Sequence, residues 1–403
     1  MKGNVLRAIM RKNRMAKQLA IGAVTFLIFF VFLWPSSPEP SRSYYDFIRR
    51  PETQFVDCGR VLRNDTRYTH YIGRYRPKLR PSQYIDMSCA GIKSRILPAR
   101  NRNVGFPIAY AKIVYMDYEF LEEQLAANYA HENTYCFVLD KKAPEEFKMR
   151  IAALAGKKCL PNVILASTSR NISSFGFNQN QAHLDCLEAI AKRKWKYVVL
   201  QQNHDLVIKT HAEIANIFRI YNGSSDFEVE KCKRNRSKLC QSTNVFWAKG
   251  GVQMSLARPS VDYILREFNL TEILSQLDGL PKFVDEMLFQ TLLTTEFFGV
   301  PSGFPEKCIA KGGQQATKYS EWTMDFLCKS HKTGPGGYCI FGIENLPDLA
   351  INPAIIATKV RPDFDYAIVS CVSEMLYNRT IGEDDHNMDK DFYRQLNRVR
   401  SAM

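Results

Sequence analysis

Two acidic residues follow apolar runs that have the pattern of buried strands. Asp140 directly follows TYCFVL, and Asp205 comes a few residues after YVVL. In open α/β sheets, ligands bind at the carboxyl ends of the strands, so Asp140 could accept a hydrogen bond from the hydroxyl of a sugar or ribose. From position alone, each acid could equally be a loop residue that caps the next helix.

Patterns for other kinds of nucleotide site are absent from the sequence. Neither G-x-G-x-x-G nor G-x-x-x-x-G-K-S/T follows the first predicted strand, so a Rossmann dinucleotide site or a P-loop is not supported. A D-x-D pair commonly holds a divalent ion on a nucleotide diphosphate, but none directly follows a predicted strand. No Cys/His group has the spacing of a zinc site. We therefore expect no metal or other cofactor. A bound diphosphate would need Lys or Arg to balance its charge.

The elements that would position these acids alternate along the chain from Phe106 onward. The predicted strands are 107–115, 134–140, 162–166 and 195–200, and the predicted helices are 118–129, 145–155 and 181–191. This alternation predicts an α/β fold with a mixed, mostly parallel central sheet.

The first 35 residues predict a membrane anchor. Six basic residues precede the apolar run LAIGAVTFLIFFVFLW at 19–34. This order places the N-terminus in the cytosol and the rest of the chain in a lumen. The run ends in Phe-Leu-Trp-Pro, a poor cleavage site, which favours an uncleaved anchor over a signal peptide. We predict a cytosolic tail (1–18), a signal anchor (19–34), a stem (35–57), a lumenal domain (58–385) and a polar C-terminal tail (386–403).

The net charge of +14 does not indicate a nucleic-acid partner. Six of the positive charges lie in the predicted cytosolic tail, and one local cluster spans 231–238 without any nucleic-acid-binding motif. That cluster is either a solvated loop or a contact for an anion or substrate.

The cysteines and glycosylation motifs agree with a lumenal domain. Eleven cysteines follow the predicted anchor, and an oxidising compartment makes disulfides the expected state. The odd number leaves at least one thiol outside intramolecular bridges. The six N-x-S/T sites are Asn64, Asn171, Asn222, Asn235, Asn269 and Asn378.

Eight segments, in order and spacing, resemble the core-2/I-branching β-1,6-N-acetylglucosaminyltransferases. This is glycosyltransferase family 14, which also contains protein O-xylosyltransferase. The resemblance covers roughly residues 58–375. The segments are FPIAYAKIVY (106–115), TYCFVLDKKAPEEF (134–147), PNVILAS (161–167), AHLDCL (182–187), WKYVVLQQNHDLVIKTHAEI (195–214), FVDEMLFQTLL (283–293), YCIFGIENLPDL (338–349) and ATKVRPDFD (357–365).

The resemblance implies a type II Golgi membrane protein with a GT-A-type fold. Such an enzyme is inverting and metal-independent, transfers GlcNAc from UDP-GlcNAc to a glycan or glycoprotein acceptor, and could form a homodimer. The family's catalytic base corresponds to Glu286, which would deprotonate the acceptor hydroxyl and contribute ~10²–10⁴ in rate. The residue pattern alone would make Glu286 an exposed acid at the start of a helix.

The resemblance also implies residues for the UDP-sugar. Lys359 matches a Lys that meets the diphosphate, Asp140 matches an Asp that contacts the nucleoside, and Tyr115 stands where the family has a His. A second departure is Gly336, which stands where the family has an Arg on the diphosphate. Lys332 or Arg361 could replace that Arg.

Acceptor contacts and disulfides follow from the same resemblance. Trp322 resembles the acceptor-side Trp of the family, although a core Trp is an equal alternative, and Asp285 is a second acceptor-side candidate. The glycines of Trp247–Gly251 would let a sugar approach the backbone. The implied bridges are Cys58–Cys371, Cys89–Cys159, Cys136–Cys186 and Cys328–Cys339. A bridge between Cys232 and Cys240 would then be plausible, and Cys308 would be left as a thiol.

Three functions are consistent with the sequence. The first is a Golgi-anchored GlcNAc-transferase that makes β-1,6 branches on O-linked or related glycans. The second is an O-xylosyltransferase-like enzyme that uses UDP-xylose, which the short segment after Cys371 disfavours. The third is a catalytically silent relative that binds glycans, a reading that rests on Gly336.

Overall fold

The computed structural model describes residues 49–97, 103–156, 159–233, 239–241, 245–282, 284–309, 315–382 and 388–396. The predicted cytosolic tail, anchor and most of the stem, together with Asn235, lie outside these residues. Within the described residues, no helix is long and apolar enough to cross a membrane.

Five strands form the central sheet, in the order β3-β2-β1-β4-β8. The first four are parallel, and β8 pairs antiparallel with β4. The predicted mixed, mostly parallel sheet is therefore confirmed. The bounds are β1 (Ile108–Val114), β2 (Thr134–Leu139), β3 (Val163–Leu165), β4 (Tyr197–Gln201) and β8 (Met254–Ala257).

Short strands form two smaller sheets. One has the order β5-β10-β9, and the other pairs β6 with β7. The bounds are β5 (Leu206–Val207), β6 (Glu230–Lys231), β7 (Ala248–Lys249), β9 (Lys318–Tyr319) and β10 (Ile356–Ala357).

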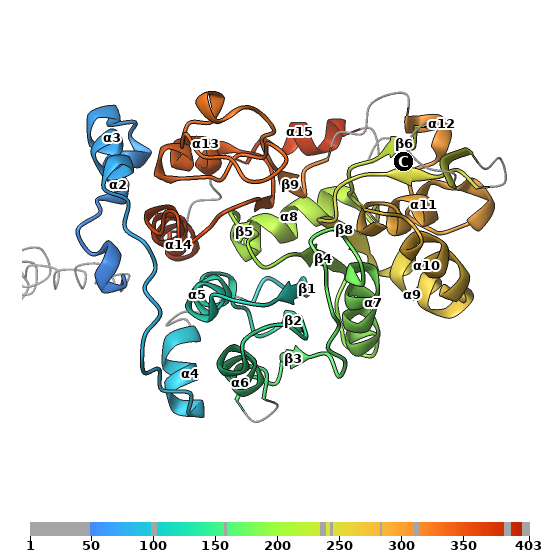
Figure 1. Cartoon of the computed structure of the whole chain (residues 1–403), viewed down its shortest axis with the longest axis horizontal. Coiled ribbons are helices and arrows are strands. Elements are labelled where there is room, and N and C mark those ends of the chain that lie inside the picture. Colours follow the sequence, from blue (N-terminus) through green and yellow to red (C-terminus); the bar gives the residue numbers. More distant parts are fainter. Residues whose placement is uncertain are drawn as a thin grey trace, which may run out of the picture. The chain divides into compact units, whose positions relative to one another are not determined.

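Helices cover both faces of the central sheet. Figure 1 shows α5 and α14 on one side of the strands and α7 on the other. The α-helices are α2 (Cys58–Leu62), α3 (Thr66–Arg74), α4 (Cys89–Ile96), α5 (Tyr118–Asn128), α6 (Glu145–Leu154), α7 (Gln179–Ile190), α8 (His211–Tyr221), α9 (Arg258–Glu267), α10 (Thr271–Asp278), α11 (Leu288–Thr294), α12 (Glu306–Ile309), α13 (Leu346–Ile351), α14 (Ala367–Ile381) and α15 (Lys390–Gln395).

Strand β1 shows why these residues form a central strand. All seven of its residues are buried, and successive side chains point to opposite faces. Ile108, Tyr110 and Val114 join the core beneath α5 and α14, whereas Ala109 and Ala111 join the core beneath α7. A strand buried on both faces reads as a continuous apolar run, and the one exception in β1 is Lys112.

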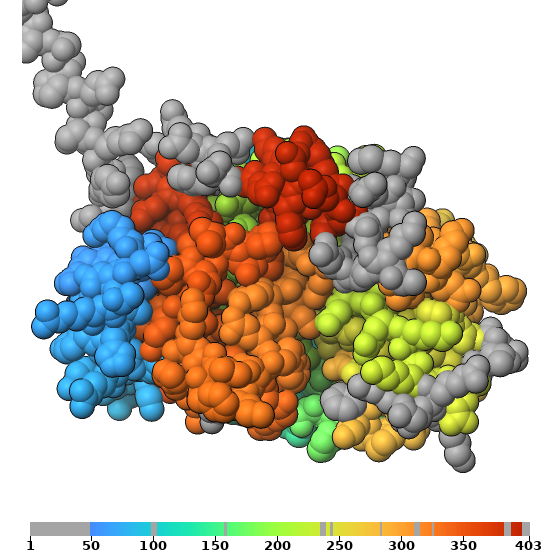
Figure 2. Space-filling model, turned by 90° about the horizontal axis from the view of Figure 1, so that it is seen from above, coloured from blue at the N-terminus to red at the C-terminus, as the bar shows by residue number. Residues whose placement is uncertain are grey.

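The packed domain extends beyond 58–385 at both ends. Thr53, within the predicted stem, is buried and hydrogen-bonds Ser370 of α14 at 2.8 Å. Tyr393 of α15 is 1% exposed, and its hydroxyl donates to the Pro353 carbonyl at 2.7 Å. Figure 2 shows residues 49–97 (blue) beside the C-terminal segments (orange to red).

Five disulfides are present, including all four that the family resemblance implies. They are Cys58–Cys371, Cys89–Cys159, Cys136–Cys186, Cys232–Cys240 and Cys328–Cys339. Cys308 is a buried thiol. The longest-range bridge, Cys58–Cys371, ties the N-terminal helices to α14.

Candidate active site

Tyr115 and Asp140 lie side by side at the carboxyl edge of the central sheet. They follow β1 and β2, and the Asp140 amide donates to the carbonyl of Val114 at 3.0 Å. The Asp140 carboxylate accepts a hydrogen bond from the amide of Lys142 at 2.9 Å, and the residue as a whole is 7% exposed. Parallel pairing therefore brings both predicted nucleoside residues to one edge.

Tyr115 is the first member of a polar array with His204 and Asp117. Its hydroxyl lies 3.3 Å from His204 Nδ1, and His204 Nε2 lies 2.8 Å from Asp117 Oδ2. Because an ionised carboxylate only accepts, Nε2 donates to Asp117, and in the neutral imidazole Nδ1 then accepts from the tyrosine hydroxyl. Burial, reinforced by the Asp117 charge, raises the pKa of Tyr115 to about 12. Tyr115 is thus a neutral, partly exposed ring that can stack on a base.

Asp205 has a structural role instead of a ligand-binding one. It is 0% exposed, and its carboxylate accepts from Gln202 N, Gln253 Nε2 and Thr358 Oγ1 at 2.5–3.0 Å. These contacts tie the turn after β4 to the segment after β10. Neither of the alternatives considered from position, a ligand contact or a helix cap, describes this acid.

Lys359 and Arg361 follow β10 and flank the Tyr115 array. The amide of Val360, between them, donates to the His204 carbonyl at 3.0 Å. Lys359 Nζ lies 5.6 Å from the centroid of the Tyr338 ring. The guanidinium of Arg361 binds Asp363, and its pKa is raised by that carboxylate. Two cations therefore stand beside the predicted nucleoside site.

Gly336 cannot simply be exchanged for the Arg of the family. Its φ is +90°, a backbone conformation that favours glycine, although a side chain there would meet open space. Its neighbour Gly337 also has a positive φ, +88°, and a Cβ added there would lie 3.5 Å from the Thr323 carbonyl oxygen. Of the two proposed substitutes, Arg361 lies close enough to Tyr115 and Tyr338 to interact with them electrostatically. Lys332, by contrast, is an exposed residue of the loop that contains Gly336.

Glu286 and Asp285 lie in a short 3₁₀ turn, η3 (Val284–Glu286), just before α11. Glu286 is partly exposed, and its Oε2 lies 2.9 Å from Lys249 Nζ at the end of β7. The Gly250 amide donates to the Glu286 carbonyl at 2.9 Å, which fixes η3 against β7. Glu286 is thus not the fully exposed acid that its position before a helix suggested.

Asp285 is buried beside this pair. Burial and the Glu286 charge raise its pKa to about 7, although the charges of Lys359 and Lys249 act in the opposite direction. The ammonium groups of Lys249 and Lys359 thus both act on the Asp285 carboxyl, and Lys249 also pairs with Glu286. These four residues form one patch, which contains both the predicted base and the predicted diphosphate residue.

Gly176 makes room for Asp285, and the substitution Gly176→Ala is expected to reduce both stability and turnover. The φ of Gly176 is +98°, and a Cβ added to Gly176 would lie 2.1 Å from Asp285 Oδ1. We expect a loss of roughly 1–3 kcal/mol in unfolding free energy, measured by chemical denaturation, and a lower kcat. The matched control is Gly223→Ala, because Gly223 has φ +94° and no atom within 4 Å of the added Cβ. Equal turnover in the two variants would contradict a role for the Asp285 position.

Trp322 is an exposed aromatic residue, not a core one. It is 65% exposed and packs edge-to-face on Tyr338, with ring centroids 5.7 Å apart. Tyr338 therefore contacts both Trp322 and the ammonium group of Lys359. This is a suitable place for a sugar ring to stack.

The glycines after Trp247 serve a different purpose from the predicted one. An added Cβ on Gly250 would lie 1.8 Å from the Glu228 carbonyl, and one on Gly251 would meet Lys318 Nζ at 2.4 Å. These glycines allow other segments of the same chain to approach closely. Their presence therefore gives no support for a sugar at this backbone.

Sequence reasoning missed Lys249, His204 as a partner of Tyr115, and Tyr338. Lys249 lies within the stretch Trp247–Gly251, and no spacing rule links it to Glu286. His204 lies within the segment 195–214, where no pattern relates it to Tyr115. A search for cations near each candidate acid would have required the fold.

Comparison with known proteins identifies the family. The sequence-family model described as "Core-2/I-Branching enzyme" matches residues 108–350 of the chain. The chain belongs to the core-2/I-branching enzyme family. The resemblance predicted from the eight segments is confirmed, as is the prediction of a glycosyltransferase.

Curated members of this family match over most of their length. The human β-1,3-galactosyl-O-glycosyl-glycoprotein β-1,6-N-acetylglucosaminyltransferase 3 is 28% identical over 382 residues, 84% of this chain and 86% of the relative. A bovine herpesvirus 4 enzyme named as a β-1,3-galactosyl-O-glycosyl-glycoprotein β-1,6-N-acetylglucosaminyltransferase is 29% identical over 380 residues, with the same coverage. The human N-acetyllactosaminide β-1,6-N-acetylglucosaminyl-transferase is 26% identical over 316 residues, 72% of this chain and 77% of the relative.

Proposed function

We propose that this member of the family is an inverting, metal-independent glycosyltransferase with a GT-A-type fold. It transfers GlcNAc from UDP-GlcNAc in β-1,6 linkage to branch O-linked or related glycans. The names of the curated relatives support the transferred sugar and the linkage. The observation that carries the proposal is the patch in which Glu286 pairs with Lys249 beside Asp285 and Lys359.

Glu286 would act as the general base. Its carboxylate takes the proton of the acceptor hydroxyl while that oxygen attacks the anomeric carbon of the donor. The bond from the anomeric carbon to the diphosphate oxygen breaks on the opposite side, and UDP leaves with the electron pair. One direct displacement inverts the anomeric configuration.

Lys359 and Arg361 would balance the charge of the diphosphate. Both follow β10, next to the Tyr115 array. The Nε and Nη2 atoms of Arg361 bind Asp363, so its guanidinium would reach a phosphate oxygen through its remaining N–H donors or by exchanging Asp363 for the phosphate. Two cations at this place support leaving-group stabilisation without a divalent ion. Tyr115 and Asp140 would hold the nucleoside, and Trp322 would hold the acceptor.

We further propose a Golgi membrane protein with its catalytic domain in the lumen. The five disulfides require an oxidising compartment during folding. The five described N-x-S/T asparagines are all exposed, as glycan attachment requires; they are Asn64, Asn171, Asn222, Asn269 and Asn378.

The test is a product analysis with the purified full-length chain in detergent. UDP-GlcNAc and UDP-xylose are offered separately with a panel of O-glycan acceptors, and the products are analysed by NMR. A β-1,6-linked GlcNAc is the expected product. Xylose transfer would favour the O-xylosyltransferase-like alternative. A chain that neither turns over nor binds UDP in calorimetry would be a silent relative.

A further inference from the structure

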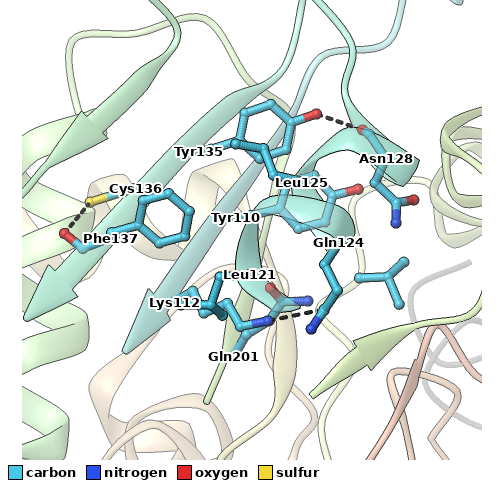
Figure 3. A pocket seen from close by; sticks show the side chains of 11 residues that line it. Tyr110, Lys112, Leu121, Gln124, Leu125, Asn128, Tyr135, Cys136, Phe137 and Gln201 are labelled. Carbon is cyan, nitrogen blue, oxygen red and sulfur yellow. Dashed lines mark hydrogen bonds between the residues drawn. The ribbon is translucent and has the colours of Figure 1, made fainter. Parts of the chain in front are cut away.

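A small cavity lies between the central sheet and α5, behind the strand ends that form the site. Its volume is about 40 Å³, and its walls come from β1, β2, β4, β5 and α5. Figure 3 shows aromatic rings on one side and the polar ends of Lys112, Gln124 and Gln201 together on the other. None of the residues assigned to catalysis or acceptor binding lines it.

Four buried polar atoms in this cavity have no hydrogen-bond partner within the described part of the chain. They are Tyr110 Oη, Gln124 Nε2, Asn128 Oδ1 and Gln201 Nε2. Each of these side chains is at most 6% exposed. An unsatisfied buried polar group is strongly unfavourable, and such groups in native proteins are normally satisfied by ordered water.

Water fits both the size and the chemistry of the cavity. One water molecule needs at least ~10–15 Å³ of such volume and two to four polar partners, so the cavity has room for about three. The four atoms include donors and an acceptor, and water can serve both.

Lys112 connects this cavity to the candidate donor site. It is 5% exposed in the middle of β1, and its Nζ donates to Gln124 Oε1 at 3.1 Å and to the Asp205 carbonyl at 3.0 Å. An ammonium has three protons, so the third can donate to water in the cavity. Burial lowers its pKa to about 8, which leaves most of it charged at neutral pH.

The carbonyl that Lys112 binds belongs to the turn Gln202–Asp205, which carries contacts of the donor site. Asn203 Oδ1 accepts the Tyr115 amide at 2.8 Å, and His204 meets the Tyr115 hydroxyl. The Asp205 carboxylate accepts from Thr358, which directly precedes Lys359. The turn therefore bridges the nucleoside side and the diphosphate side.

We propose that Lys112, together with about three buried water molecules in this cavity, is a positioning residue that holds the turn Gln202–Asp205 in place for the donor. The description of the turn as part of a donor site rests on the function proposed above. The position of the turn itself does not.

Hydrogen exchange of the full-length chain, followed by mass spectrometry without any donor, tests the positioning. The variant is Lys112→Met, which keeps an unbranched chain and removes the ammonium. Its matched control is Tyr110→Phe, which alters the same cavity without contacting the turn. Because hydrogen bonds to charged groups are the stronger ones, we expect exchange in the Gln202–Asp205 segment to become about tenfold faster in Lys112→Met alone.

Each outcome decides the inference. Unchanged exchange in the turn, or equal acceleration throughout the domain, would overturn the positioning role. A wild-type crystal structure that shows the cavity dry would overturn the water site even if Lys112→Met does not fold. In the companion measurement, calorimetry, we expect UDP affinity to fall about tenfold in Lys112→Met. If the wild type itself binds no UDP, the proposed function fails, whereas the exchange result still stands.

Discussion

We expect Glu286→Gln to lower kcat by ~10²–10⁴, the range that general-base catalysis typically contributes. The substitution keeps the size of the side chain but removes its ability to accept the proton of the acceptor hydroxyl. It also removes the negative charge that pairs with Lys249, whose Nζ lies 2.9 Å from Glu286 Oε2. Turnover is measured as UDP release at saturating UDP-GlcNAc and acceptor, and UDP affinity is measured by calorimetry.

The control for this prediction is Glu296→Gln, which makes the same chemical change at an exposed acid paired with Lys307. We expect it to keep wild-type turnover. In Glu286→Gln, we expect UDP affinity to change little, because the diphosphate and nucleoside contacts lie on other elements. A Glu286→Gln variant that keeps more than a tenth of wild-type kcat would exclude Glu286 as the base.

We expect Lys359→Met to weaken UDP binding by roughly 10- to 100-fold, since a hydrogen bond to a charged group contributes about 1.5–3 kcal/mol. Methionine keeps an unbranched apolar side chain of nearly the same length, which can still pack near Tyr338, and it removes the positive charge. The loss should appear in the calorimetric affinity for UDP and in the KM for UDP-GlcNAc.

Lys329→Met is the matched control, because Lys329 is an exposed lysine that pairs with Asp348. Its UDP affinity should equal that of the wild type. If Lys359→Met also leaves UDP affinity unchanged, Lys359 does not meet the diphosphate. A complete loss of binding in Arg361→Met would then assign that role to Arg361 alone.

Much of the sheet could be predicted from the sequence. The runs at 107–115, 134–140, 162–166 and 195–200 correspond to β1, β2, β3 and β4 within one to two residues at most ends, because a strand buried on both faces is a continuous apolar run. Strands β5 to β10 were not predicted. All of them except β8 have only two residues, and the four residues of β8 (Met254–Ala257) are still too few to show a clear period.

The candidate site depended on the family resemblance more than on residue patterns. Glu286 and Lys359 each stand alone in the sequence, and their roles came from matched segments. The pairing of Lys249 with Glu286 and the burial of Asp205 depend on contacts between distant segments. Lys112 interrupts an apolar run and could have been noticed as an anomaly, but its partners Gln124 and Asp205 required the fold.

The most direct test of the proposed mechanism is the initial rate of UDP release from UDP-GlcNAc, with O-glycan acceptors, in the presence and absence of EDTA. If Lys359 and Arg361 balance the diphosphate charge, the purified full-length chain turns over at the same rate in both conditions. A rate that EDTA abolishes and added Mn²⁺ restores would contradict metal-independent transfer and the roles given to these two cations.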